Sequence, residues 1–354
     1  MPSKRASMAN SIVDDVMLRL IDLRTVFARL DADAIATELY PAVRKVADEL
    51  ARDLDARKRW GPLAASVVAP GGPFDAALEA RGTALVAGFV RDVQVDPAAV
   101  FDLRQVVVDG VARDASVLVR LFERCGEKDL RFVVDSGLAL GGLLGVGQML
   151  LWIAWSPWWS LAVTGALVGL VTDQLALKLI FEPVEPRRVG PLVVQGLFLK
   201  RQDEVSREFA SFMAANVLTA PQLWDALLAG SRSSAFWRLL ALRIDSAIGV
   251  APDGGLPNLA GQALYKFLGP DDWAWLRAEA VERLRRALPA AVPAVYGLTE
   301  RSLQLEATMV EEMGRLSSAE FERVLHPVFE EDEWTLILIG TALGGIAGVL
   351  QATV

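Results

Sequence analysis

The sequence predicts an all-α integral membrane protein with about three transmembrane helices, a hairpin plus a C-terminal span, and with helical regions in the cytoplasm. Three observations lead to this fold class. Residues 136–172 and residues 334–354 contain no Asp, Glu, Lys or Arg. The same glycine pattern occurs in both of these runs. The rest of the chain is charged, with apolar residues at helical spacing, which is typical of amphipathic helices.

The first charge-free run predicts a helical hairpin. It has 37 residues (172 − 136 + 1). A single helix of that length would extend about 55 Å, well beyond the roughly 30 Å of a bilayer core. Pro157 favours a turn, because proline removes a helical donor and clashes with the preceding turn. We expect three spans, at about 136–155, 160–181 and 335–354.

The repeated pattern is built from glycines about four residues apart and ends in a glutamine. Its first copy comprises Gly137, Gly141, Gly142, Gly145 and Gln148, and each residue recurs 203 positions later (340 − 137 = 203), as Gly340, Gly344, Gly345, Gly348 and Gln351. The second span has a shorter version at Gly165 and Gly169. Such a stripe lets a neighbouring helix approach closely, so we interpret it as a helix-packing surface. A pore wall or a hinge is the alternative, and the recurrence suggests a duplicated unit.

The positive charges predict the orientation, since Lys and Arg near span ends favour the cytoplasmic side. Basic residues flank the hairpin at its two open ends: Arg120, Arg124, Lys128 and Arg131 before it, and Lys178, Arg187, Arg188, Lys200 and Arg201 at or after its end. The hairpin tip and the C-terminal tail have none. We therefore expect both soluble regions in the cytoplasm, and the tip and the C-terminus outside. Four tryptophans fit the headgroup layer at the tip: Trp152, Trp155, Trp158 and Trp159.

These patterns divide the chain into four expected regions. They are an N-terminal cytoplasmic helical region (1–134), a transmembrane hairpin (135–182), a cytoplasmic helical domain (183–333) and a C-terminal transmembrane helix (334–354). No apolar core of signal-peptide length follows Met1, so we expect no cleaved signal.

Within the soluble regions the pattern is helical. Residues 8–58 and 75–134 are separated by a Pro- and Gly-rich break at about 60–74. Asp96 and Pro97 are typical of a helix start, and residues 183–333 carry little strand signal. The acidic run from Glu330 to Glu333 is expected to lie at the N-terminus of the last helix, where the dipole favours negative charge.

Few residues offer chemistry. The chain has one cysteine, Cys125, and one histidine, His326, so no disulfide within the chain and no His- or Cys-based metal site is expected. Its net charge of −8 and the lack of a basic block disfavour nucleic-acid binding. No phosphate-binding loop, His-Glu-x-x-His or nucleophile elbow occurs. We therefore predict that the protein is not an enzyme and has no catalytic residues, cofactor or metal.

Asp173 is the most informative single residue, because it lies inside the second span. A carboxylate at mid-membrane costs about 2.5–3.5 kcal/mol on insertion scales, so such residues face protein or water and find a partner. Thr172 is one candidate partner. The candidate intramembrane polar site comprises Asp173, Gln174, Gln148, Gln351 and Lys178. A structural hydrogen bond and a proton or cation site are both open interpretations.

Three segments of the chain resemble motifs of a known family, and the first of them contains Asp173. Thr172 to Pro183 (TDQLALKLIFEP) resembles a Thr-Asn-x-x-Ala-x-Lys-x-x-Phe-x-Pro signature of the bacterial membrane-protein family "domain of unknown function 445". Residues 195–201 (QGLFLKR) and 326–334, with the glycine span that follows, resemble its other motifs. The resemblance covers about 118–354 and implies a bacterial inner-membrane protein without an assigned activity. Asp173 stands where this family often has Asn.

Three functions remain open. The favoured one is a non-enzymatic scaffold whose cytoplasmic helices bind a partner or self-assemble. The second is an oligomeric channel or transporter that uses Asp173 and the glutamines. The third is lipid binding or transfer by the cytoplasmic helices. The expected partners are the lipid bilayer and either a homo-oligomer or a membrane protein, with no nucleic acid.

Overall fold

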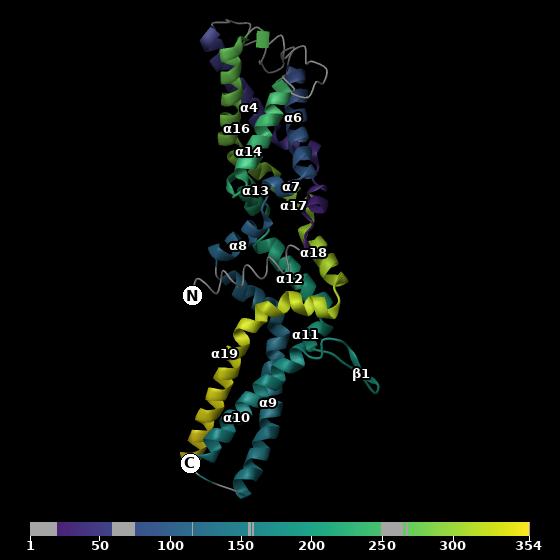
Figure 1. Ribbon diagram of the computed structural model, residues 1–354, viewed down its shortest axis with the longest axis vertical. Helices are drawn as coiled ribbons and strands as arrows, with labels where there is room; N and C mark the ends of the chain where they lie inside the picture. Colours follow the sequence, from purple (N-terminus) through teal and green to yellow (C-terminus); the bar gives the residue numbers. More distant parts are fainter. Residues whose placement is uncertain are drawn as a thin grey trace. The chain divides into compact units, whose positions relative to one another are not determined.

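The computed structural model describes residues 20–58, 75–114, 116–154, 157, 159–248, 265–266 and 268–353 (Figure 1). Across these residues the chain is helical, with one two-stranded hairpin, so the all-α prediction is confirmed. The chain forms two compact units. Unit 1 contains Val107–Val217 and Glu306–Val354, and unit 2 contains Ile21–Val106 and Leu218–Leu305. The four predicted region boundaries stay a prediction.

Unit 1 contains the three apolar helices and the shorter helices attached to them. Its elements are α9 (Ser116–Ala154), α10 (Ser160–Phe181), β1 (Arg187–Val189), β2 (Leu192–Val194), α11 (Leu197–Lys200), α12 (Gln202–Asn216) and α19 (Ser318–Thr353). Two further helices cross the division between the units: α8 (Leu103–Arg113) and α18 (Leu305–Arg315).

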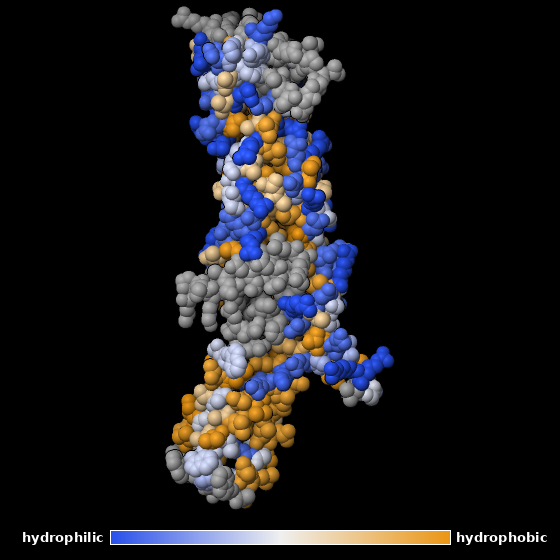
Figure 2. Space-filling model, viewed as in Figure 1, coloured by the Kyte–Doolittle hydropathy of each residue, from blue (hydrophilic) through white to orange (hydrophobic). Residues whose placement is uncertain are grey.

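Three helices are long and apolar enough to cross a membrane, as predicted. The candidate spans are Arg131–Ile153, Ser160–Phe181 and Trp334–Ala352. Figure 2 shows the apolar surface as a continuous orange band over α9, α10 and α19, and Leu138 in it is 83% exposed. Soluble proteins rarely leave an apolar patch of this extent in water. The band therefore indicates contact with lipid.

Two of the spans belong to longer helices. Helix α9 has 39 residues and α19 has 36, about 58 and 54 Å of helix. Both helices extend well beyond the apolar stretch into the soluble part of unit 1. The membrane segments are therefore joined to the soluble segments without a flexible linker.

The expected capping role of the acidic run is wrong. Helix α19 begins at Ser318 and continues through Glu330–Glu333, so these residues lie inside the helix. Its start is capped instead by Ser317 and Glu320: the Ser317 backbone N–H donates to a Glu320 carboxylate oxygen at 2.8 Å, and the Glu320 N–H donates to Ser317 Oγ at 3.3 Å. This reciprocal pair is a capping box. Its Ser-x-x-Glu spacing is visible in the sequence.

The expectation of little strand in the middle segment misses one hairpin. Strands β1 and β2 pair in antiparallel register, with Arg187 opposite Val194 and Arg188 opposite Val193. The connection contains Gly190 at φ +63°, a left-handed conformation that glycine adopts without strain. The strands have only three residues each, too few to give a clear alternating pattern.

Unit 2 is a set of packed amphipathic helices. Its elements are α3 (Leu23–Phe27), α4 (Ala32–Lys58), α6 (Asp75–Val95), α7 (Pro97–Val100), α13 (Ala220–Ala229), α14 (Ser233–Ile248), α16 (Pro270–Ala291), η2 (Val292–Val295) and α17 (Tyr296–Leu303). Helix α4 packs along α6 and α16. Arg283 of α16 forms ion pairs with Asp53 of α4 and, at 2.9 Å, with Glu279. The core is apolar, with Phe236 and Ile244 almost fully buried.

The N-terminal helical pattern is divided more finely than expected. Within 20–58, helix α3 ends at Phe27 and α4 begins at Ala32, where the Asp31 side chain accepts a 2.9 Å bond from the Ala34 N–H. Asp96 and Pro97 occupy the predicted first positions of α7. The predicted break at 60–74, Trp155 and Trp158 lie outside the described residues.

Candidate functional site

Helices α10 and α19 approach so closely that their backbones are in contact. A Cβ on Gly165 would overlap the Gly344 carbonyl oxygen, and a Cβ on Gly169 would overlap the Gly340 oxygen. One helical turn further along, a Cβ on Gly348 would overlap the Leu161 oxygen. The contacts step by four residues in opposite directions along the two helices. The helices are therefore antiparallel, in the arrangement that small-xxx-small stripes permit.

The glycines of the first copy of the pattern make no comparable backbone contact. A Cβ on Gly137, Gly141 or Gly145 would have no described atom within 4 Å outside its own helix. Helix α9 nevertheless packs on α10. At the tip, the Gln148 side-chain amide donates to the Leu161 carbonyl at 3.4 Å. Both copies of the pattern thus reach the same turn of α10, but only the α19 copy is in backbone contact.

Asp173 lies directly over Gly340 in the α10–α19 contact. A Cβ at Gly340 would overlap the Asp173 carboxylate, so the missing side chain of glycine makes room for it. Within the described part of the chain, no hydrogen bond or ion pair to the Asp173 carboxylate occurs. The neighbouring Thr172 is 6% exposed, and its hydroxyl is buried without a hydrogen-bond partner among the described atoms.

The predicted polar residues do not come together around Asp173. Gln148 bonds Leu161, which is 12 residues (173 − 161) and about 18 Å of helix away from Asp173. Gln174, Lys178 and Gln351 are exposed. The contact found around the candidate intramembrane site is thus that of Asp173 with Gly340. The sequence singled out Asp173 but not its contact with Gly340, because that contact joins residues 167 positions apart (340 − 173).

A second polar cluster lies where α9 meets α12. Arg201 donates to Asp129 at 2.8 Å and to Glu204 at 3.1 Å. Lys128 bonds Glu204 at 2.5 Å. The Asp129 side chain is only 8% exposed. Burial raises the pKa of Asp129, with the Arg201 charge opposing it, while the Arg201 hydrogen bond lowers the pKa of Glu204 to about 2.

Two glutamines extend this junction to α18 and α19. The Gln202 amide donates to the Met313 and Leu316 carbonyls at 3.0 and 2.9 Å, and thereby satisfies the C-terminal end of α18. The Gln195 amide donates to Ser318 Oγ at 3.0 Å, at the start of α19. The cluster therefore connects the two long helices through the segment that follows the hairpin.

Aromatic packing completes the junction. The Phe198 ring lies 5.6 Å from the Phe181 ring and 5.7 Å from the Phe321 ring, centroid to centroid. Gly196 is required next to it, because a Cβ there would lie 2.6 Å from the Ile180 carbonyl oxygen. Its N–H donates to the Pro183 oxygen at 3.0 Å, after a cis Glu182–Pro183 bond. Phe181, Pro183 and Gly196 belong to the motifs quoted from the sequence, which did not indicate this joint role.

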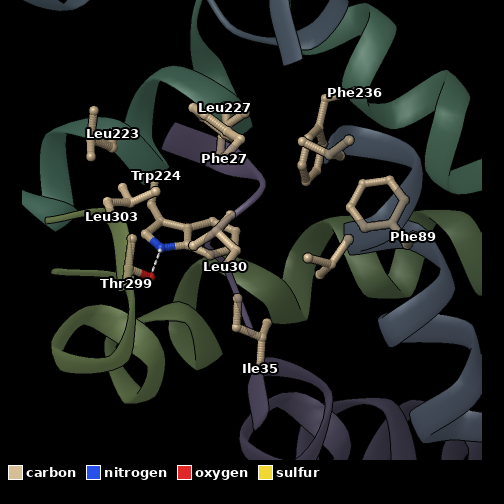
Figure 3. Close-up of a pocket in the computed structure, with 12 residues that line it drawn as sticks. Phe27, Leu30, Ile35, Phe89, Leu223, Trp224, Leu227, Phe236, Thr299 and Leu303 are labelled. Carbon is tan, nitrogen blue, oxygen red and sulfur yellow. Dashed lines mark hydrogen bonds between the residues drawn. The ribbon is translucent and has the colours of Figure 1, made fainter. Parts of the chain in front are cut away.

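One cavity in unit 2 is small and apolar (Figure 3). Its volume is about 40 Å³, room for a few waters and far below the roughly 300–1,000 Å³ of ligand pockets. Phe27, Phe89 and Leu227 are among its lining residues. The Trp224 indole N–H donates to Thr299 Oγ at 3.1 Å beside it, which satisfies the buried indole. This cavity cannot hold an acyl chain.

The described residues show no constellation for metal or nucleophilic chemistry. No group of three His, Cys, Asp or Glu side chains among them could hold a metal ion. Cys125 is buried, and desolvation raises the pKa of its thiol to about 12, so the thiolate that a nucleophile requires is disfavoured.

Comparisons with known proteins find distant bacterial relatives. The chain is 25% identical over 143 residues to UPF0754 membrane proteins of Bacillus cereus and Bacillus anthracis, and equally similar to one of Bacillus thuringiensis. The matched segment covers 39% of this chain and 35% of each relative, so the chain spans about a third of the length of the curated relatives it matches. No family model matches the chain. No solved structure matches it either. With the three apolar helices, these relatives support a bacterial membrane location.

The glycine contact predicts unequal effects at equivalent positions of the two copies. Gly344→Leu should lower the free energy of unfolding by about 1–3 kcal/mol, because a side chain there must push α10 and α19 apart. Gly141→Leu, its counterpart in the first copy, should change it by less than about 0.5 kcal/mol. Denaturant unfolding in detergent micelles measures both. Equal losses would contradict the assignment.

The junction predicts a pH-dependent defect. Arg201→Gln leaves Asp129 buried without its main counter-charge and should cost about 3–5 kcal/mol of stability near neutral pH. Because burial raises the Asp129 pKa, the folded protein binds this proton at higher pH than the unfolded chain does, so stability should recover as the pH falls through the raised pKa of the folded state. The control is the Arg201→Gln/Asp129→Asn double variant, whose stability should lack this pH dependence. A pH-independent loss in the single variant would contradict the prediction.

Proposed function

We propose that this protein is a membrane-anchored scaffold whose helical unit 2 binds a helical partner. The observation that carries the proposal is that the two long helices of unit 1 are connected to each other outside the apolar band. Helices α9 and α19 continue unbroken from the apolar band into the soluble part, and Arg201, Gln202 and Gln195 connect them there. A continuous, cross-braced frame is suited to holding a position relative to the membrane.

A groove between α4 and α6 of unit 2 supplies a partner-binding surface. It has a volume of about 570 Å³ and is lined mainly by small side chains: Ala36, Thr37, Ala76, Ala80, Thr83, Ala84 and Ala87. Ala80 and Ala84 are exposed and one turn apart. Small residues on two adjacent helices let a third helix approach, as in helix-in-groove recognition.

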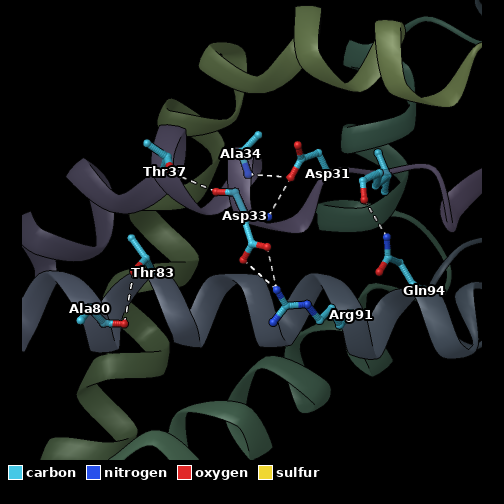
Figure 4. A network of polar contacts seen from close by, with 9 residues as sticks. Asp31, Asp33, Ala34, Thr37, Ala80, Thr83, Arg91 and Gln94 are labelled. Carbon is cyan, nitrogen blue, oxygen red and sulfur yellow. Dashed lines mark hydrogen bonds and ion pairs between the residues drawn. The ribbon is translucent and has the colours of Figure 1, made fainter.

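Charged and polar groups define one end of this groove (Figure 4). Arg91 donates to both Asp33 carboxylate oxygens, at 2.7 and 2.9 Å, and thereby joins the end of α6 to the start of α4. Gln94 donates to the Phe27 and Leu30 carbonyls at 3.1 and 2.8 Å. The Thr37 and Thr83 hydroxyls are already bonded to carbonyls of their own helices. The groove thus combines small apolar side chains with the charged Asp33, Glu79 and Arg91, and a helical partner would need polar groups to match them.

The proposal includes location and family. We assign the chain to the bacterial inner membrane as a multi-pass protein, with soluble helices in the cytoplasm and the C-terminus outside, on the basis of its basic residues. The motif resemblance supports membership of the family "domain of unknown function 445". The distant relatives named as membrane proteins are consistent with both.

Filling the groove tests the proposal. Ala84→Trp should reduce the partner complex about tenfold or more, since excluding one well-packed contact costs at least ~1.4 kcal/mol. Ala278→Trp, at an exposed position of α16, is the matched control and should leave the complex intact. Mass spectrometry of native-membrane discs counts the bound chains and distinguishes a second copy from another protein. A wild-type monomer without a bound protein would contradict the scaffold function.

Asp173 favours a second candidate, an ion or proton pathway in an oligomer. The supporting observation is a carboxylate inside a span, packed over Gly340, that no described group bonds. One span contact encloses no pore, so the pathway would form between chains. Asp173→Asn should lower flux through reconstituted vesicles about tenfold, and Gln174→Glu serves as a control with an exposed side chain. Absence of flux in the wild type would remove this candidate.

Lipid transfer is the function that the geometry supports least. It needs a hydrophobic groove of acyl-chain size. The apolar cavity of about 40 Å³ in unit 2 is an order of magnitude too small, and the larger groove between α4 and α6 is lined partly by charged side chains.

A further inference from the structure

The hairpin of β1 and β2 has no buried face among its described side chains. Arg187, Arg188, Val193 and Val194 are all exposed, the two valines by 46% and 41%. An isolated two-stranded hairpin is marginally stable in water. Its side chains therefore lack the apolar support that the helices of unit 1 receive from one another.

The register gives each face of the hairpin one arginine opposite one valine, and Val189, opposite Leu192, falls on the same face as Arg187. Arg187 lies opposite Val194, and Arg188 lies opposite Val193. Directly opposed residues project to the same face, and neighbouring residues on a strand project to opposite faces. Each face thus carries one arginine and at least one apolar residue. Guanidinium binds phosphate oxygens in bidentate fashion, and an apolar neighbour suits the boundary between headgroups and acyl chains.

The hairpin starts close to the end of a membrane span. Helix α10 ends at Phe181, six residues before Arg187 (187 − 181). Even fully extended, that segment reaches no more than about 21 Å, so the hairpin begins within that distance of the end of the span. Figure 1 shows the hairpin leaving unit 1 beside α11, and Figure 2 shows the same arm as a hydrophilic projection next to the apolar band.

The charge of this segment differs in sign from that of the whole chain. Residues 178–200 contain four basic side chains, Lys178, Arg187, Arg188 and Lys200, and two acidic ones, Glu182 and Glu185, giving a net charge of +2 (4 − 2) against −8 for the chain. In the described part of the molecule, neither Arg187 nor Arg188 has an ion-pair partner. Two uncompensated guanidinium groups are therefore available to an anion outside the chain.

We propose that the β1–β2 hairpin binds the headgroups of anionic phospholipids at the membrane surface where α10 ends. Arg187 and Arg188 contact lipid phosphates, and Val193 and Val194 enter the headgroup boundary. Each basic residue held at an anionic surface contributes about fivefold in binding. This lipid contact fixes the depth of unit 1 in the bilayer, and it is independent of the scaffold function proposed above.

A nitroxide label on the hairpin tests the proposal. Val193→Cys is labelled in the full chain and placed in discs of phosphatidylcholine, with or without phosphatidylglycerol. Collision rates with a water-soluble nickel chelate and with oxygen report whether the label is in water or in the headgroup boundary. Phosphatidylglycerol should lower the nickel collision rate several-fold. Labelling of the chain without the added cysteine gives the background from Cys125, which is buried.

Two charge variants separate headgroup recognition from nonspecific effects. Arg187→Gln/Arg188→Gln should abolish the effect of phosphatidylglycerol, whereas Arg187→Lys/Arg188→Lys should retain most of it. Arg81→Gln/Arg238→Gln removes two exposed charges from unit 2 and should change nothing. Nickel accessibility that is high in both lipids would overturn the proposal and point to a protein partner or to water. Protection that is equal in both lipids would overturn the anionic specificity.

Discussion

The membrane part of this protein depends on the backbone contact between α10 and α19. Between membrane helices there is no hydrophobic driving force, because lipid tails are as apolar as leucine. Association then depends on close van der Waals contact. Because glycine has no Cβ, a carbonyl oxygen of one helix can contact the backbone of the other. Gly165, Gly169 and Gly344 supply that contact. The absence of a Cβ at Gly340 likewise makes room for the Asp173 carboxylate, so the surface on which the two helices pack also contains a polar group.

The soluble part of unit 1 is held together by a different set of interactions. There, the ends of the spans must be held together where water competes for every polar group. Asp129 is buried and ionic, and its charge is tolerated because Arg201 is fixed beside it by Glu204. Phe198 packs between Phe181 and Phe321 on the same joint, and removes apolar surface from water. A buried ion pair is a weak source of stability by itself, but its loss is costly. The cluster therefore defines one arrangement of the long helices.

The predictions from sequence succeeded where they depended on local physics. A run without charges must be buried or in lipid, and Pro157 favours a turn in a run too long for one span, so the three candidate spans were foreseen within a few residues. They failed where a local signal had two explanations. An acidic run can cap a helix or lie within one, and α19 starts at Ser317–Glu320 instead. Three-residue strands are too short for an alternating pattern, so the hairpin was missed.

The sequence by itself determined that this is a helical membrane protein with three candidate spans, and that glycine stripes and Asp173 lie within these helices. Those features follow from composition and spacing along one helix. Only the tertiary structure decided which stripe is in contact. The α19 copy meets α10 backbone to backbone, whereas a Cβ on Gly137, Gly141 or Gly145 of the α9 copy would meet no described atom within 4 Å. It also decided that Asp173 faces Gly340 and that Arg201 neutralises Asp129. These pairs join residues 72 or more positions apart, so no local pattern could specify them.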